Sequence, residues 1–451
     1  MSTRGELLVD PKLGQAPLTA VVEKILAQAR QQGASAAEAA VSVGQGLAVT
    51  VRLGEVETVE HNRDKHLGLT VYFGHKSGSA STSDFSDAAI RDTVRAACSI
   101  AKYTAEDECA GLADRDRLAT KFPDLELYHP WNPGTAQAIE LARVCEDAAR
   151  RVDARIKNSE GAAVSTQEGV EVYGNTHGFI GTIPTTRHSV SCSVIAQDDG
   201  GMQRDYWYST ARDHRDLDSV TEVGAQAGRR AARRLGARKL DTRQTAVIYE
   251  APVASSLLSH FINAVRGSSL YRRASFLLDH IDKPVFAEHV RIFEQPHLKK
   301  GLGSAAFDSE GVATVAHDIV TAGVLKSYVL DSYSARKLGL ETTGNAGGIH
   351  NLTISTGEHD LPALLREMGS GLLISELIGF GVNVVTGDYS RGAAGFWVEG
   401  GEIQFPVEEV TVAGNLKQMF ADLVAVGNDV DTRGNIRSGS ILVRRMTVAG
   451  S

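Results

Sequence analysis

The first half of the chain alternates between two spacings of apolar side chains, one helical and one strand-like. Apolar residues at helical spacing predict a first helix from about Pro17 to Gln32, which Gly33 can end in a left-handed cap. Alternating apolar and polar residues then predict three strands, at 38–45, 47–62 and 67–74. The last strand turns back on the polar segment after it as a hairpin. A helix followed by antiparallel strands favours an α+β fold.

More helices and strands follow before residue 240. Together they predict an N-terminal domain, residues 1–239, in which an antiparallel sheet is flanked by helices. The proline-containing stretch 109–134 is expected to cross the surface of this domain. The remaining elements are expected as helices at 84–103, 135–156 and 219–235 and as strands at 161–175 and 187–197.

The second half, residues 240–451, has shorter apolar segments separated by more turns. Residues 312–331 predict one hairpin. The clearest hairpin is 396–406, where Gly400 and Gly401 can supply the positive φ angles that a two-residue turn requires. We therefore expect a C-terminal domain that is mostly antiparallel β-structure and barrel-like.

Composition and charge exclude several classes of protein. The net charge of −8 disfavours a nucleic-acid binder, because such binding relies on neutralising phosphates. The one basic run, Arg229 to Lys239, is interpreted as a solvated helix face. No segment has the roughly 20 apolar residues that span a bilayer, and the first residues do not resemble a signal peptide. Four scattered cysteines without CxxC spacing indicate reduced thiols and a cytoplasmic protein.

A search for catalytic residues finds no recognisable set. None of the 14 histidines is followed by glutamate, so the His-Glu pair of a zinc hydrolase helix is missing. Phosphate-binding loops and nucleophile elbows are also missing. The run Gly344-Asn345-Ala346-Gly347-Gly348, with His350 after it, could let a backbone approach a peptide, or it could be a cluster of turns. The residues themselves predict no catalytic and no metal-binding side chain.

Several segments nevertheless resemble the TldE (PmbA) branch of the TldD/TldE metallopeptidase family, in order along essentially the whole chain. The most specific is the segment Gly387–Trp397, GDYSRGAAGFW, together with the hairpin that it begins. The others are CAGLAD at 109–114, GNTHG at 174–178, YRRASFLLD at 271–279, FDSEGV at 307–312, SYSARKLGL at 332–340 and GNAGGIHN at 344–351.

The resemblance implies a bacterial cytosolic complex of two paralogous subunits that cleaves unfolded peptides. In that family TldD binds zinc through an HExxxH helix and a later cysteine. Aligned with that helix, this chain has Ser259 for the first histidine, His260 for the glutamate and Ala264 for the second histidine. Its last cysteine is Cys192, so the late cysteine is missing as well. The resemblance thus implies no cofactor in this chain and zinc in the partner.

The same resemblance suggests which residues line a peptide channel or the interface with the partner. An ion pair between Asp388 and Arg391 is expected, with Phe396 and Trp397 as apolar anchors of the hairpin. The full set of candidates is Gly344, Asn345, His350, Asp388, Tyr389, Arg391 and Trp397.

The predicted function is that of a metal-free subunit of a TldD/TldE-type zinc peptidase, paired with a TldD-like subunit as a heterodimer. Two alternatives stay open. One is a self-sufficient hydrolase with an unrecognised site, for example a serine beside a histidine. The other is a homodimeric scaffold or regulator without proteolytic role, because paralogous subunits usually keep a shared interface.

Overall fold

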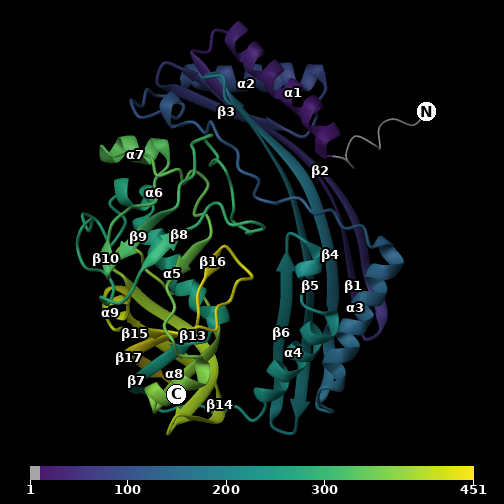
Figure 1. Cartoon of the computed structure of the whole chain (residues 1–451), viewed down its shortest axis with the longest axis vertical. Coiled ribbons are helices and arrows are strands. Elements are labelled where there is room, and N and C mark those ends of the chain that lie inside the picture. The colour runs from purple at the N-terminus through teal and green to yellow at the C-terminus, as the bar shows by residue number, and fades with distance from the viewer. Residues whose placement is uncertain (1–10, 451) are drawn as a thin grey trace.

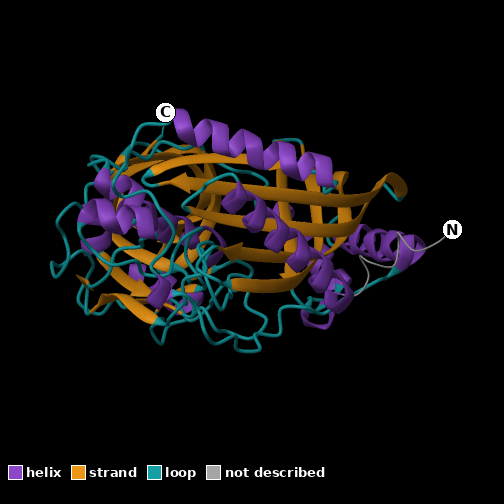
Figure 2. Cartoon of the chain, turned by 90° about the horizontal axis from the view of Figure 1, so that it is seen from above, coloured by secondary structure: helices purple, strands orange, loops and turns teal. Residues whose placement is uncertain are grey.

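The structure is a computed structural model that describes residues 11–450, and the side chains from residue 16 onward. Figure 1 shows a long curved sheet with helices on its outer side, and a second body of strands, loops and short helices held in its concave side. Seen from above, the long strands run beneath two prominent helices (Figure 2). Within residues 11–450, no helix is long and apolar enough to cross a membrane.

The first half forms one six-stranded antiparallel sheet in the order β3-β2-β1-β4-β5-β6. The elements are α1 (Pro11–Gln31), β1 (Ala36–Arg52), β2 (Glu55–Phe73), β3 (Lys76–Thr82), α2 (Asp87–Tyr103), a 3₁₀ turn (Arg115–Arg117), α3 (Gly134–Arg151), β4 (Ile156–Asn175), β5 (Ile180–Asp198), β6 (Gly201–Ala211), a 3₁₀ turn (His214–Asp216) and α4 (Val220–Arg233).

Strand β1 shows how this sheet buries both faces. Its odd-numbered positions Ala37 to Val41 pack under α1 and α2, and Leu47 to Val51 pack under α3. Since alternate side chains point to opposite faces, all four helices cover the same face. The even-numbered positions, such as Glu38 and Ala40, point toward the second half of the chain.

Most predicted elements of this half are confirmed, with three corrections. The strands predicted at 38–45 and 47–62 are parts of one hairpin, whose turn lies at Leu53 and Gly54 with φ angles of 52° and 82°. The predicted helix 135–156 ends at Arg151, because Ile156 already begins β4. Strand β6 was not predicted; its residues alternate poorly in hydrophobicity, because most of its positions carry polar or aromatic side chains.

The second half contains a closed barrel of five strands, β14-β13-β12-β7-β17, in which β14 also pairs with β17. A second sheet has the order β10-β9-β8-β11-β16. The elements are β7 (Arg243–Tyr249), α5 (Ala251–Val265), α6 (Gly267–Tyr271), β8 (Ile292–Glu294), β9 (His317–Thr321), β10 (Val324–Leu325), α7 (Ser332–Leu338), β11 (Leu352–Ile354), α8 (Leu361–Met368), β12 (Gly371–Ile378), β13 (Asp388–Glu399), β14 (Glu402–Asn415), α9 (Leu416–Ala421), β15 (Leu423–Val426), β16 (Ile436–Arg437) and β17 (Ile441–Ala449).

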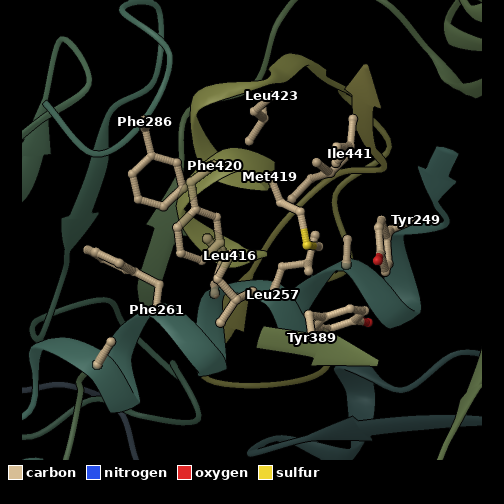
Figure 3. Packing of buried hydrophobic residues seen from close by; sticks show 14 of the residues in the cluster. Tyr249, Leu257, Phe261, Phe286, Tyr389, Leu416, Met419, Phe420, Leu423 and Ile441 are labelled. Atoms are coloured by element: carbon tan, nitrogen blue, oxygen red, sulfur yellow. The ribbon is translucent and has the colours of Figure 1, made fainter. Parts of the chain in front are cut away.

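The α+β class and the barrel-like C-terminal half are confirmed. The turn at Gly400 and Gly401 has the expected positive φ angles, 61° and 80°. The half is less purely antiparallel than expected, because β7 pairs with β12 in parallel. It also contains the 15-residue helix α5, packed on the barrel by the apolar cluster of Figure 3. A division between residues 239 and 240 stays a prediction.

The stretch 109–134 does more than cross a surface. Leu112, Leu118 and Leu125 are buried. The backbone nitrogen of Ala119 donates to the carbonyl of Gly311 at 2.9 Å. On the other side Arg336 donates to carbonyls of this stretch and to Asp114. The stretch therefore links the long sheet to the second half of the chain.

Buried carboxyl groups also lie where the two halves meet. Glu38 accepts hydrogen bonds from the hydroxyls of Tyr72 and Tyr173 at 2.8 and 2.7 Å. Nearby, Glu310 accepts from the backbone of Ser332 at 3.0 Å. Burial and the neighbouring charges of Asp308 and Asp331 raise the pKa of Glu310 to about 7.

The contact between α3 and α4 generates a first prediction. A methyl group added at Gly224 would lie 1.9 Å from the carbonyl oxygen of Cys145. Alanine normally favours a helix by about 1 kcal/mol over glycine, but separating two packed helices costs more. We expect Gly224→Ala to lower the free energy of unfolding by ~1–3 kcal/mol, as overpacked cores do. Urea unfolding measures this. Gly434→Ala is the control, because its new methyl meets nothing closer than 3.8 Å; equal effects of both changes would contradict the prediction.

Glu310 generates a prediction about pH. Because its folded pKa of about 7 lies above the ordinary 4.5, its contribution to stability is complete below about pH 4.5 and is lost as pH rises through 7. Glu310→Gln keeps the acceptor for Ser332 and removes the ionisation. At pH 8 we expect the variant to unfold at a higher urea concentration than the parent, with a free energy of unfolding larger by up to roughly 3 kcal/mol. At pH 4.5 the two free energies should differ little. The exposed Glu106→Gln is the control, and an unchanged pH dependence in Glu310→Gln would refute the assignment.

Candidate functional site

Helix α5 carries the positions that resemblance aligned with a zinc-binding helix. It follows β7 directly, and Leu257, Leu258 and Phe261 anchor it in the largest apolar cluster (Figure 3). Ser259 donates its hydroxyl to the carbonyl of Ser255 at 3.1 Å, which is a bond within the helix. Ala264 is fully buried in the core. Neither residue offers a free ligand atom.

His260 is the one side chain of this set that could bind a metal or a substrate. It is partly buried, its ring packs edge-on against that of Tyr389 at 5.9 Å, and its buried Nε2 has no hydrogen-bond partner. Burial, and secondly the positive charge of Arg391, lower the pKa of His260 to about 4. At neutral pH this imidazole is therefore uncharged.

Other polar atoms near His260 are also buried without partners. They are the hydroxyl of Ser375 on β12 and Nε of Arg391 on β13. The hydroxyl of Tyr389 lies against Tyr249 and Arg391 instead. Ser375 is the extra residue of a bulge in β12, between Ile374 and Glu376. Tyr389 lies beside Tyr249, the last residue of β7, which precedes the start of α5 (Figure 3). Buried polar atoms without partners are few in proteins, and each calls for an explanation such as strain, a catalytic role or a bound ion.

A cavity of about 280 Å³ opens next to these groups, and we call it the β6–α5 pocket. The long sheet provides one wall through Trp207 and Tyr208 of β6, with Arg230 of α4. The barrel half provides the other through Ser256 of α5 and Arg391 of β13, besides Ser375, Leu377 and Arg433. The pocket thus lies between the two halves of the chain.

One side of the pocket is held by a network of buried ion pairs. Arg230 donates to Asp205 at 3.1 Å and to Glu250 at 3.2 Å. Arg234 pairs with Glu376 at 2.5 Å and approaches Asp205 at 3.5 Å. Breaking such a pair on one side leaves a buried charge, which costs several kcal/mol. The network therefore fixes α4 against β6 and the barrel.

This network corrects the interpretation of the basic run. Arg230 and Arg234 are only 6% and 8% exposed, so half of the helix face that was expected to be solvated is buried against carboxylates. The sequence signal was present in the spacing of four between these arginines, which places them on one side of α4. Their acidic partners come from distant segments, which sequence reasoning did not connect.

Sequence reasoning also missed the aromatic part of the pocket. The guanidinium of Arg433 stacks on Trp207 at 3.7 Å from the ring centre and on Tyr208 at 4.5 Å, while Asp431 pairs with it at 2.6 Å. The 200–211 segment carried no motif, and Arg433 lies more than 200 residues further along the chain.

The candidate residues of the resemblance do not gather in one place. Of the seven, only Tyr389 and Arg391 lie beside α5. Gly344 lines a different hollow near Phe122, and His350 a third one beside Asp308. Asn345 is buried and donates to Glu294 at 3.0 Å, so its role in the fold is to hold its loop.

The expected ion pair between Asp388 and Arg391 is wrong. Three positions apart on β13, their side chains point to opposite faces of the strand. Asp388 is exposed and accepts from Thr386 and Asn415. Trp397 carries the guanidinium of Arg243 at 5.0 Å and packs against the largest apolar cluster.

The residues present do not fit a zinc ion. Zinc needs three or four nitrogen, sulfur or carboxylate ligands, and among residues 11–450 no three His, Cys, Asp or Glu side chains are grouped to hold a metal. The four cysteines all lie in the first half. Near His260 the closest ionic group is the guanidinium of Arg391, which repels a cation.

Comparisons with known proteins match this arrangement. Sequence profiles of the PmbA/TldA metallopeptidases match residues 37–101 as domain 1, 128–235 as the central domain and 242–450 as the C-terminal domain. The chain belongs to this family, the PmbA/TldD metallopeptidases. Relatives include metalloprotease PmbA of Escherichia coli O157:H7, 50% identical with 94% of each chain covered, and its homologue in Haemophilus influenzae, 48% identical with the same coverage.

Solved structures of this family share the fold. A protein of Bacteroides thetaiotaomicron, described as a candidate modulator of DNA gyrase, is 28% identical with a TM-score of 0.91, covering 96% of this chain and 99% of that one. TldE of Thermococcus kodakarensis has a TM-score of 0.81 at 18% identity, covering 95% and 100%. The TldE/PmbA resemblance seen in the sequence is confirmed.

The contact between Arg391 and His260 generates a prediction. Replacing Arg391 with glutamine removes a positive charge that opposes protonation of the imidazole, while burial stays. We expect the pKa of His260 to rise from about 4 toward its ordinary value of 6.5, without reaching it. An NMR titration of the imidazole signals measures this, with the His260 signal assigned by its loss in His260→Asn. An unchanged pKa would mean that Arg391 points away from this histidine.

Proposed function

We propose that this chain is the metal-free subunit of a TldD/TldE-type peptidase, and that a TldD-like partner supplies the zinc ion and the catalytic groups. Unfolded peptides are the substrates of the complex. The observation that carries the proposal is helix α5, where Ser259 and Ala264 stand at the two histidine positions and make only contacts within the protein.

The electrostatics around α5 support the same proposal. A zinc site concentrates negative or neutral ligand atoms around a double positive charge. Here the neighbouring cation is Arg391, and it lies close enough to depress protonation of His260. The positive charge of Arg391 would repel a divalent cation at this place.

Membership of the family supports the proposed partner and location. Paralogous subunits with one fold commonly pair about a two-fold axis, so we propose a heterodimer in the cytoplasm. A homodimer in isolation stays an alternative. A self-sufficient serine hydrolase finds no support, because no serine is hydrogen-bonded to a histidine in the described part of the chain.

Metal content and proteolysis, measured for this chain alone and for its mixture with a TldD-like subunit, test the proposal. We expect less than stoichiometric zinc and no cleavage of casein by the chain alone, and cleavage on mixing. As the matched control, a partner whose HExxxH histidines are replaced should give no activity when mixed with this chain. Chelator-sensitive cleavage by the isolated chain would overturn the proposal.

A further inference from the structure

When the ion-pair partners of its lining residues are counted too, the β6–α5 pocket has one cation more than it has anions. Arg230 and Arg234, with Arg233 beside them, face the three carboxylates of Asp205, Glu250 and Glu376. Three positive charges thus meet three negative ones. This part of the pocket is electrically balanced, and its carboxylates are already engaged.

The other arginines of the pocket differ in whether a carboxylate pairs with them. Arg204 pairs with Glu160 at 2.5 Å, and Arg433 pairs with Asp431 at 2.6 Å. Arg391 has no carboxylate partner among the described residues. Its Nε is buried and makes no hydrogen bond. A guanidinium can only donate, so Nε lacks an acceptor, and the group beside this guanidinium is the neutral hydroxyl of Tyr389.

A second donor in the pocket lacks an acceptor too. Ser375, which lines the pocket, is 2% exposed and its hydroxyl makes no hydrogen bond. By contrast, the hydroxyl of Ser256 on the same wall donates to the carbonyl of Val253 at 2.7 Å. The unsatisfied groups are therefore a cation and a hydroxyl, which together suit an anionic oxygen ligand.

We propose that the β6–α5 pocket binds one carboxylate group of a peptide, with Arg391 as its ion-pair partner and Ser375 as a second donor. Trp207, Tyr208 and Leu377 form the apolar walls around the residue that carries the carboxylate. The volume of about 280 Å³ is at the lower end of small-molecule sites, so it takes about one residue. One unpaired cation matches a singly charged carboxylate better than a doubly charged phosphate.

The inference that the ligand is a peptide rests on the proposed function. The inference that the ligand is an anion rests only on the charges of the pocket. The carboxylate can be a chain terminus or an acidic side chain, because both present the same two oxygens to a guanidinium. In either case this chain holds the substrate of the complex by charge while the partner cleaves it.

Binding to the purified full chain, without partner, tests the inference by calorimetry with three probes. N-acetyl-Ala-Ala has a terminal carboxylate, N-acetyl-Ala-Ala-amide has none, and N-acetyl-Asp-amide has only a side-chain carboxylate. We expect at least one of the two acids to bind about 10- to 100-fold more tightly than the neutral amide. The tighter acid identifies the source of the carboxylate. Equal binding of all three probes, or tighter binding of inorganic phosphate, would overturn the proposal.

Variants locate the site. Arg391→Gln should weaken binding of the preferred acid about 10- to 100-fold, and Ser375→Ala, which keeps the charge, should weaken it about 3- to 10-fold. Arg238→Gln is the matched control, since it removes an arginine that lies over Phe405 of the barrel, outside the pocket. Thermal melting checks that each variant folds, and Arg391→Lys replaces Arg391→Gln if that variant does not. Unchanged affinity in both pocket variants would refute the site.

The outcomes separate this inference from the proposed function. Carboxylate binding without activity on mixing would leave the pocket in place and remove the role as a peptidase subunit. Activity on mixing without carboxylate binding would support the role as a peptidase subunit and refute the carboxylate site.

Discussion

The long sheet must bury both of its faces, and the rest of the structure follows from that requirement. Its strands reach 20 residues, so each face is too large to leave open to water. One face takes four helices, on the odd-numbered positions of β1. The other face carries Glu38, Tyr173 and the aromatic cluster around Phe179, and it is covered by the second half of the chain. The concave arrangement of Figure 1 is the result.

Covering that second face brings charged side chains out of water, and the protein pairs them. Arg230 and Arg234 lose solvent when α4 packs against the barrel, and Asp205 and Glu250 compensate them. A buried pair of this kind adds little net stability but strongly disfavours other arrangements, because a shifted helix would leave charges unpaired. Arg391, which pairs with no carboxylate among the described residues, then becomes informative, because it lines the pocket.

Helix α5 shows how a metal-binding position can be lost while a fold is kept. The apolar side of the helix, with Leu257 and Phe261, anchors it in the core (Figure 3). Under the proposed function its other side needs no ligands, because the partner supplies them. Serine and alanine there are small and satisfied within the helix, so the packing survives. The space and charge beside it form the β6–α5 pocket, which we propose binds a carboxylate.

The sequence by itself determined the helices and strands with clear periodicity, the Gly400-Gly401 turn and the family. These depend on local spacing and on motifs that stand together in the chain. It also predicted that α5 lacks zinc ligands, which remains a proposal. Only the tertiary structure decided that β6 exists, that Arg230 and Arg234 are buried, and that Asp388 and Arg391 point apart. The β6–α5 pocket joins Trp207, Arg391 and Arg433, residues about 180 and 40 positions apart in the chain, and no local pattern encodes which distant carboxylate meets which arginine.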